Sequence, residues 1–166
     1  MPANNVTRML DAKKIAYTAF ETEPVKLGAR ETARRLGVPV EIVYKTIVVK
    51  REKAGKLILA VVPGDAAVDL KRLASALGEK KLQLPTQAEA EKLTGLQAGG
   101  ISPLALINRG FQVVIDERAR SKDQIHISGG QRGLNIRIGT ADLAGLVRAR
   151  FAPISQPLAE GEEDAD

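Results

Sequence analysis

A single lysine stands in an otherwise apolar stretch at residues 43–49 of the 166-residue chain. β-Branched and aromatic residues dominate this stretch and favour a β-strand. Because strand side chains alternate between two faces, Lys45 shares its face with Val43, Ile47 and Val49. An ammonium group on an apolar face is costly unless a partner offsets its burial. Both a functional lysine and an edge-strand or snorkelling lysine fit this pattern.

Two glycine-containing segments, residues 98–103 and 128–134, could contribute to the same chemistry. Gly99 and Gly100 would let the backbone approach a ligand, and exposed amides there could bind an anion or a carbonyl oxygen. Taken alone, each segment also fits an ordinary tight turn or a wide hairpin. Neither matches a P-loop or the dinucleotide-binding fingerprint, so we expect no nucleotide cofactor.

The remaining residue types exclude several catalytic classes. The chain has no Cys, which rules out a thiol nucleophile of the protein, disulfides and cysteine-ligated metals. Its single histidine, His126, cannot build a multi-histidine metal site. That residue alternates with Ile125 and Ile127, which indicates a partly buried strand residue rather than a catalyst. We therefore expect neither a Ser–His–Asp triad nor a metal or other cofactor.

The elements that must position these residues form one predicted α/β domain, a mixed β-sheet with helices packed around it. Helices are expected over residues 5–14, 30–36 and 70–77, from Thr86 to residue 93, and from a capping Thr140 to residue 150. Strands are expected over residues 15–22, 43–49, 56–62, 81–84, 111–116, 125–128 and 134–138. Asp116 and Glu117 are expected to be solvated at a strand end.

The net charge of +5 is unevenly distributed. The last nine residues contain five acids and no base, so the preceding chain has a net charge of +10, from 25 basic and 15 acidic residues. A body this basic suits a polyanionic partner such as nucleic acid. We expect a domain over residues 1–154 and a disordered acidic tail over residues 155–166. No signal peptide or membrane span is expected, and the lack of Cys is compatible with a cytoplasmic protein.

Three segments together resemble the YbaK/EbsC-type aminoacyl-tRNA editing family, nearest its free-standing Cys-tRNA(Pro) deacylases. They are residues 43–46 (VYKT), 99–103 (GGISP) and 128–134 (SGGQRGL), in this order and at matching spacing. The resemblance covers about residues 5–154 and includes the order of the intervening helices. It implies a mixed, partly closed β-sheet surrounded by helices.

The resemblance also implies roles for individual residues. Lys45 would hold the aminoacyl ester or the terminal adenosine, and Gly100 would share the catalytic role. Substrate-binding roles carry over to Phe20, Thr46, Gly99, Ile101, Ser102, Pro103, Ser128, Gly129, Gly130 and Asn135. Two of these positions depart from the family, since Phe20 replaces a tyrosine and Asn135 replaces an aspartate. These departures bear on amino-acid specificity more than on the fold.

The activity implied is trans-editing, the hydrolysis of the ester of mischarged Cys-tRNA(Pro). In such deacylases the substrate's own thiol attacks the ester carbonyl, so the enzyme orients the substrate and stabilises the oxyanion. The implied partners are aminoacyl-tRNA and prolyl-tRNA synthetase. Two alternatives stay open. One is deacylation of Ala-tRNA(Pro) or another small aminoacyl-tRNA with a positioned water, and the other is a non-catalytic module that binds tRNA or a synthetase.

Overall fold

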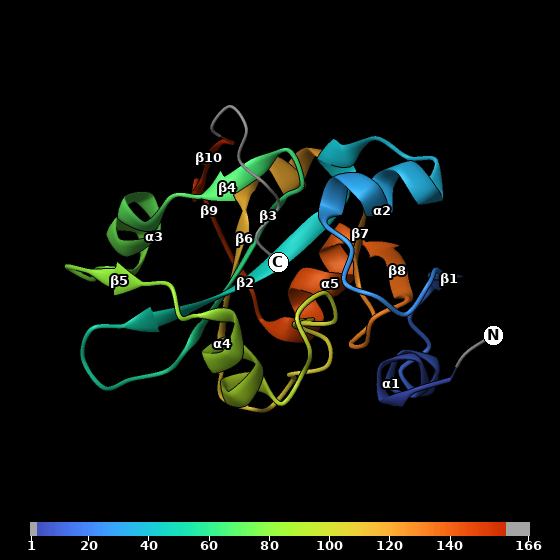
Figure 1. Ribbon diagram of the computed structural model, residues 1–166, viewed down its shortest axis with the longest axis horizontal. Coiled ribbons are helices and arrows are strands. Elements are labelled where there is room, and N and C mark those ends of the chain that lie inside the picture. Colours follow the sequence, from blue (N-terminus) through green and yellow to red (C-terminus); the bar gives the residue numbers. More distant parts are fainter. Residues whose placement is uncertain (1–2, 159–166) are drawn as a thin grey trace.

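The computed structural model describes residues 3–158, which form an α/β fold (Figure 1). The α-helices are α1 (Asn5–Ala12), α2 (Ala29–Leu36), α3 (Leu70–Leu77), α4 (Gln87–Thr94) and α5 (Thr140–Val147). Short 3₁₀ helices lie at η1 (Val40–Ile42) and η2 (Glu117–Ser121). Within the described residues, no helix is both long enough and apolar enough to cross a membrane.

The strands form three sheets. In chain order they are β1 (Tyr17–Glu21), β2 (Tyr44–Arg51), β3 (Ile58–Pro63), β4 (Ala66–Val68), β5 (Leu82–Gln83), β6 (Gln112–Asp116), β7 (Gln124–Ser128), β8 (Leu134–Gly139), β9 (Arg150–Ala152) and β10 (Ser155–Pro157). A mixed sheet has the order β5-β2-β3-β6-β9, an antiparallel sheet has the order β1-β8-β7, and β4 pairs with β10. A bridge between Val43 and His126 links the start of β2 to β7. The predicted mixed α/β architecture is confirmed.

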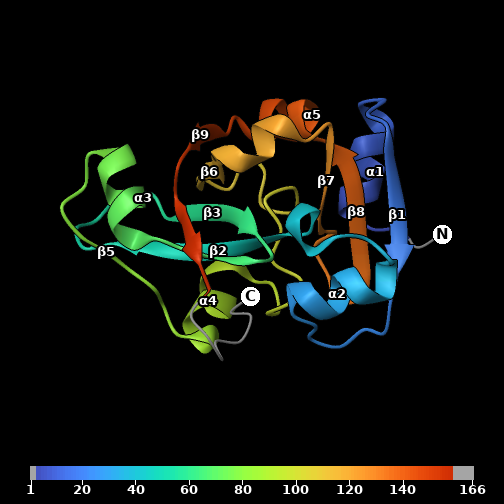
Figure 2. The same cartoon turned by 90° about the horizontal axis from the view of Figure 1, so that it is seen from above.

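Strand β2 lies at the centre of the molecule (Figure 2) and contributes residues to two apolar clusters. Tyr44 and Val48 face a large cluster that also includes the apolar face of the β1-β8-β7 sheet. Ile47 and Val49 face a second cluster beneath α3. The predicted alternation of side chains along β2 is therefore confirmed, and it places Lys45 on the same side as Ile47.

The prediction for the last helix was wrong at both ends. The N-cap of α5 is Gly139, and Thr140 is the first helical residue, whose hydroxyl has no hydrogen-bond partner among residues 3–158. The helix ends at Val147 because Arg148 adopts a left-handed conformation with φ of 53°. The chain then enters β9, which pairs in parallel with β6. This pairing is non-local, so the local sequence pattern gives no signal for it.

Asp116 is not solvated as predicted but is 1% exposed. Its carboxylate accepts hydrogen bonds from the backbone amides of Ile154 (2.9 Å) and Arg118 (3.3 Å). The bond from Ile154 holds the chain that leads into β10, and regular structure extends past the predicted boundary at residue 154 to Pro157. Residues 159–166 of the predicted acidic tail lie outside the described residues.

Candidate active site

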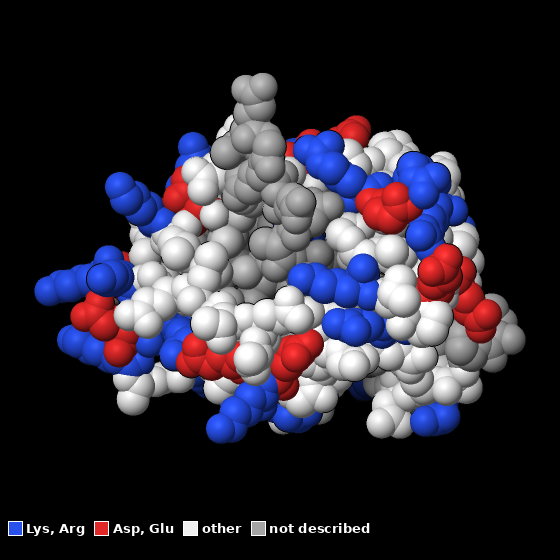
Figure 3. All heavy atoms as spheres, in the orientation of Figure 1, with Lys and Arg blue, Asp and Glu red and all other residues white. Residues whose placement is uncertain are grey.

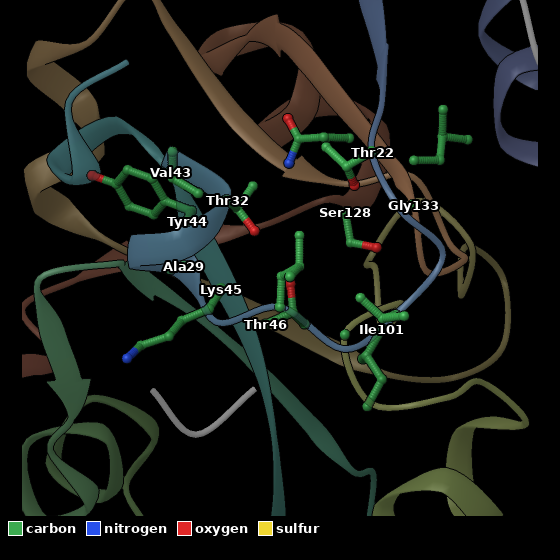
Figure 4. Close-up of a pocket in the computed structure, with 15 residues that line it drawn as sticks. Thr22, Ala29, Thr32, Val43, Tyr44, Lys45, Thr46, Ile101, Ser128 and Gly133 are labelled. Carbon is green, nitrogen blue, oxygen red and sulfur yellow. The ribbon is translucent and has the colours of Figure 1, made fainter. Parts of the chain in front are cut away.

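A small polar pocket lies where the two larger sheets meet, and Figure 4 shows the residues around it. One wall is the polar face of the β1-β8-β7 sheet, and the opposite wall is the start of β2 with the first turn of α2. The two glycine-containing segments and the chain from Thr22 to Leu27 close its sides. Six residues predicted for the site line the pocket, namely Lys45, Thr46, Gly99, Ile101, Ser128 and Asn135.

The strand register places Ser128 and Asn135 side by side in this pocket. Ser128 of β7 pairs with Asn135 of β8, and Asn135 pairs in turn with Phe20 of β1. Because paired residues in antiparallel strands point to the same face, the three side chains form one row across the sheet. The intervening residues on the strands point into the apolar core, as Ile127 and Ile136 do.

Hydroxyl groups dominate the polar surface of the pocket. In Figure 4 the hydroxyls of Thr22, Thr32, Thr46 and Ser128 surround the same space. The Thr46 hydroxyl is buried and has no hydrogen-bond partner among the described residues. A buried hydroxyl without a partner is costly, so a ligand oxygen or an ordered water at this position would stabilise the site.

Lys45 lies at the edge of this pocket, and its side chain extends away from Ser128 and Ile101 (Figure 4). The residue is only 3% exposed. It also lines a neighbouring groove, together with residues that include Lys71 and Leu84. Thr46 points to the face of β2 opposite to that of Lys45. Lys45 lines both the pocket and this groove and therefore lies between them.

The two glycine segments lie in direct contact, although about thirty residues separate them in the chain. A Cβ atom on Gly100 would lie 2.9 Å from backbone atoms of Gln131, so only glycine fits there. Arg132 Nε donates a hydrogen bond to the Ala98 carbonyl at 2.7 Å, which reinforces the contact. The segments therefore form one continuous wall.

Gly100 is part of this contact and does not line the pocket. Its amide donates to the Gln97 carbonyl at 2.8 Å. In contrast, Ile101 lines the pocket, and its amide makes no hydrogen bond with another described residue. The amide of Ile101 is therefore one of the backbone donors near the pocket that lack an acceptor among the described residues.

Three other predicted residues, Gly129, Gly130 and Ser102, are not among those that line the pocket. Gly129 accepts a hydrogen bond from the Asn4 side chain (2.9 Å), and the Gly130 amide donates to Ser128 Oγ (3.2 Å). Ser102 is fully buried, and its hydroxyl accepts from the Leu104 amide at 3.2 Å.

Pro103 lines a separate cavity, together with residues that include Phe111 and Arg148. Phe20 packs on the ring of His126, with ring centroids 5.5 Å apart, and does not line the pocket.

His126 is buried at the back of the pocket wall. Its Nδ1 lies 2.8 Å from Asn135 Oδ1. Burial lowers the pKa of His126 below its ordinary value, and the charge of Arg137 acts in the same direction, while the hydrogen bond to Asn135 opposes both. The imidazole is thus neutral at physiological pH and has no access to solvent. Within the described part of the chain, no group of three His, Cys, Asp or Glu residues could hold a metal ion.

The pocket wall formed by the chain from Thr22 to Thr32 was missed by sequence reasoning. The Thr22 amide donates to the Gly133 carbonyl at 2.9 Å, which anchors this segment to the second glycine segment. Val25 lines the pocket although its side chain is 45% exposed, and Leu27 lies beside it. Two apolar residues in a loop just before a helix were the available signal, because exposed apolar side chains often mark a binding surface.

The fold and the pocket define a protein with a polar binding site between two sheets, and comparisons with known proteins identify its family. A family model for the aminoacyl-tRNA editing domain matches residues 23–146. EbsC of Enterococcus faecalis, which is named as a Cys-tRNA(Pro)/Cys-tRNA(Cys) deacylase, is 32% identical over 91% of this chain and 92% of its own length. The chain therefore belongs to the aminoacyl-tRNA editing family, which confirms the resemblance seen in its motifs.

Two further comparisons are consistent with this assignment. A proline–tRNA ligase of Staphylococcus aureus is 28% identical over 72% of this chain, which matches 21% of the ligase. A crystal structure described as that of a trans-editing enzyme for prolyl tRNA synthetase superposes with a TM-score of 0.76, at 22% identity, covering 94% of this chain and 99% of its own. That likeness confirms the fold.

Proposed function

We propose that this protein hydrolyses the ester bond of mischarged Cys-tRNA(Pro), as a free-standing editing deacylase. The observation that carries the proposal is the composition of the pocket. Its polar lining consists of hydroxyls, an amide side chain and Lys45, and none of the described residues that line it supplies a thiol, carboxylate or imidazole. Such a site can bind and orient an ester but offers no strong nucleophile, so the nucleophile comes from the substrate or from water.

The pocket size supports a small aminoacyl group. Its cavity volume is about 50 Å³. On the same measure one water molecule needs about 10–15 Å³, so the space holds a few water molecules or a short side chain. Cysteine and alanine fit this limit, whereas an aromatic aminoacyl group does not.

In the proposed reaction the substrate's thiolate attacks its own ester carbonyl carbon. A C–S bond forms, and the carbonyl oxygen becomes an oxyanion. When the oxyanion collapses, the C–O bond to the ribose breaks and the tRNA hydroxyl leaves with a proton. Water then opens the resulting four-membered thiolactone to give free cysteine. No oxidant, metal or protein nucleophile enters this balance.

The chain's own residues position the substrate and stabilise charge. The unpaired amide of Ile101 donates to the oxyanion, while the hydroxyls of Thr46 and Ser128 hold the aminoacyl group. Lys45 contacts the negatively charged 3′ end of the tRNA from the adjoining groove. The pocket also lies at the first turn of α2, whose positive dipole end favours negative charge.

A panel of charged tRNAs tests the proposal. Release of free amino acid from Cys-tRNA(Pro), Ala-tRNA(Pro) and correctly charged Pro-tRNA(Pro) should be fastest for the cysteinyl ester. Lys45→Ala should lower kcat/KM at least about tenfold, because a charged contact to the tRNA end is lost. Lys53→Ala, an exposed lysine in the β2–β3 hairpin, is the matched control and should behave as wild type.

One observation favours a second candidate substrate. The unpaired hydroxyl of Thr46 could hold a water beside the ester carbonyl. That water would allow hydrolysis of Ala-tRNA(Pro), whose methyl group cannot attack. Faster release of alanine than of cysteine would favour this reaction. If wild type releases neither amino acid above background and Lys45→Ala changes only tRNA binding, the protein is a binding module.

We further propose that the protein acts together with prolyl-tRNA synthetase. A domain of this size has little surface with which to distinguish tRNAs, and a related sequence occurs within a proline–tRNA ligase. Adding the synthetase should raise the selectivity for Cys-tRNA(Pro) over Cys-tRNA(Cys). Equal rates on both tRNAs, with and without the synthetase, would exclude this partnership.

A further inference from the structure

The hydrogen bond between His126 and Asn135 carries an inference about how the pocket recognises its substrate. The two residues lie on neighbouring strands, and both side chains point to the polar face of the β1-β8-β7 sheet. Asn135 lines the pocket, whereas His126 lies behind it and is 0% exposed. The His126 side chain therefore reaches the pocket through its hydrogen bond to Asn135.

The geometry assigns the imidazole tautomer. Asn135 Oδ1 can only accept, so His126 Nδ1 must carry the proton in this 2.8 Å hydrogen bond. Nε2 is buried without a hydrogen-bond partner among the described residues. A proton on Nε2 would leave a buried N–H unpaired and would set two acceptors, Nδ1 and Oδ1, against each other. The Nδ1–H form avoids both costs.

Neighbouring side chains hold this arrangement in place. The Phe20 ring packs against the His126 ring, and the Arg137 guanidinium lies 5.4 Å from the centroid of Phe20. Arg137 also donates to the Thr18 hydroxyl at 3.3 Å. The positive charge of Arg137 disfavours a second proton on the imidazole. The histidine is thereby a fixed neutral donor.

The hydrogen bond to His126 uses Oδ1 of Asn135 and leaves Nδ2 as the second polar atom of the side chain. Because Oδ1 is occupied by His126, the carboxamide cannot turn over without losing that hydrogen bond. Nδ2 has no hydrogen-bond partner among the described residues and is not among their buried unpaired atoms. Nδ2 thus remains accessible in the pocket that Asn135 lines.

We propose that His126 is a positioning residue that locks the Asn135 carboxamide with its N–H₂ group toward the pocket, where it donates to a neutral oxygen of the aminoacyl ester. This inference rests on the proposed deacylase function. At this position the pocket then recognises an oxygen acceptor, and it offers no carboxylate to the substrate's α-ammonium group. Asn135, which replaces the aspartate of the family, therefore presents a hydrogen-bond donor where that aspartate would present an acceptor.

The tautomer is directly measurable, because His126 is the only histidine of the chain. Side-chain ¹⁵N NMR of the free protein should show a neutral imidazole protonated at Nδ1. The Asn135→Asp variant should raise the His126 pKa, because a carboxylate partner favours the charged ring. An imidazole protonated at Nε2 in wild type would overturn the proposal. This measurement needs no activity, so it stands apart from any failure of the deacylase function.

Deacylation by His126 variants then tests whether this residue positions Asn135. His126→Leu removes the donor, whereas His126→Asn keeps an N–H₂ group near the position of Nδ1. We expect His126→Leu to lower kcat/KM for Cys-tRNA(Pro) about tenfold or more, chiefly through kcat, and His126→Asn to restore most of it. Urea unfolding establishes that both variants are folded. If both folded variants lose activity equally, or neither loses any, His126 does not position Asn135.

Discussion

At the scale of single residues, the pocket combines neutral polar side chains with one charged residue, Lys45. Thr46, Ser128 and Asn135 present polar atoms to the pocket, and His126 supports Asn135 from behind. The sequence identified Ser128 and Asn135 through family resemblance alone. It could not reveal the bond between His126 and Asn135, because that contact depends on the register of β7 against β8.

The buried histidine predicts a pH dependence of stability. The unfolded chain binds a proton on His126 near pH 6.5, whereas the folded chain does so only at lower pH, because burial lowers its pKa. The unfolded state then binds more protons below pH 6.5, so the free energy of unfolding falls as the pH decreases. The slope reaches at most about 1.4 kcal/mol per pH unit.

Urea unfolding between pH 7.5 and 5.5 checks this expectation, with His126→Leu as the comparison. The variant has no imidazole to titrate, so its stability should change less over the same range. Equal slopes for wild type and variant would show that His126 titrates normally in the folded protein.

At the scale of elements, the site is built where distant segments touch. Local signals predicted most helices and strands. The C-caps of α2 and α3, Gly37 and Gly78, adopt the left-handed conformation that favours glycine at helix ends. The short strands β4, β9 and β10 were not predicted, because each has three residues and depends on a partner far away in the chain. The pocket wall from Thr22 to Thr32 was also missed, because it forms where this segment meets the second glycine segment, far away in the chain.

The contact between the two glycine segments predicts a large stability effect. Gly100→Ala would place a Cβ atom 2.9 Å from the Gln131 backbone, which must shift. We expect a loss of about 1–3 kcal/mol in the free energy of unfolding, together with reduced deacylation, because Ile101 would move.

Gly145→Ala is the matched control for this substitution. Its added Cβ would meet no atom within 4 Å apart from its chain neighbours and the backbone of its own helix, α5. This variant should gain up to about 1 kcal/mol, because alanine favours a helix more than glycine does. A Gly100→Ala variant as stable as wild type in urea unfolding would show that the two segments do not pack as described.

At the scale of the whole molecule, the distribution of basic residues bears on how tRNA binds. Lys and Arg side chains are spread over the face in Figure 3 and are interspersed with Asp and Glu. Lys26 and Arg132 lie beside Gly99, which lines the pocket, and we propose that this rim contacts tRNA phosphates. The fold class and the basic character of the body were both accessible from the sequence, whereas the position of the rim was not.

The uneven charge predicts how tRNA binding responds to salt and to the acidic tail. Affinity for tRNA should fall steeply with rising salt, because bound phosphates release counterions. Replacing the five acids of residues 159–166 by their amides changes the net charge from +5 to +10. That variant should bind tRNA at least about threefold more tightly at low salt. Unchanged affinity in a filter-binding titration would show that the tail does not affect binding.

We propose that the pocket positions an ester whose own thiol performs the attack. The most direct measurement compares deacylation of Cys-tRNA(Pro) with that of 2-aminobutyryl-tRNA(Pro), in which a methyl group replaces the thiol at almost the same size. We predict rapid release of cysteine and release of 2-aminobutyrate close to the uncatalysed rate. Equal rates for the two substrates would contradict the claim and would show that the nucleophile is a positioned water.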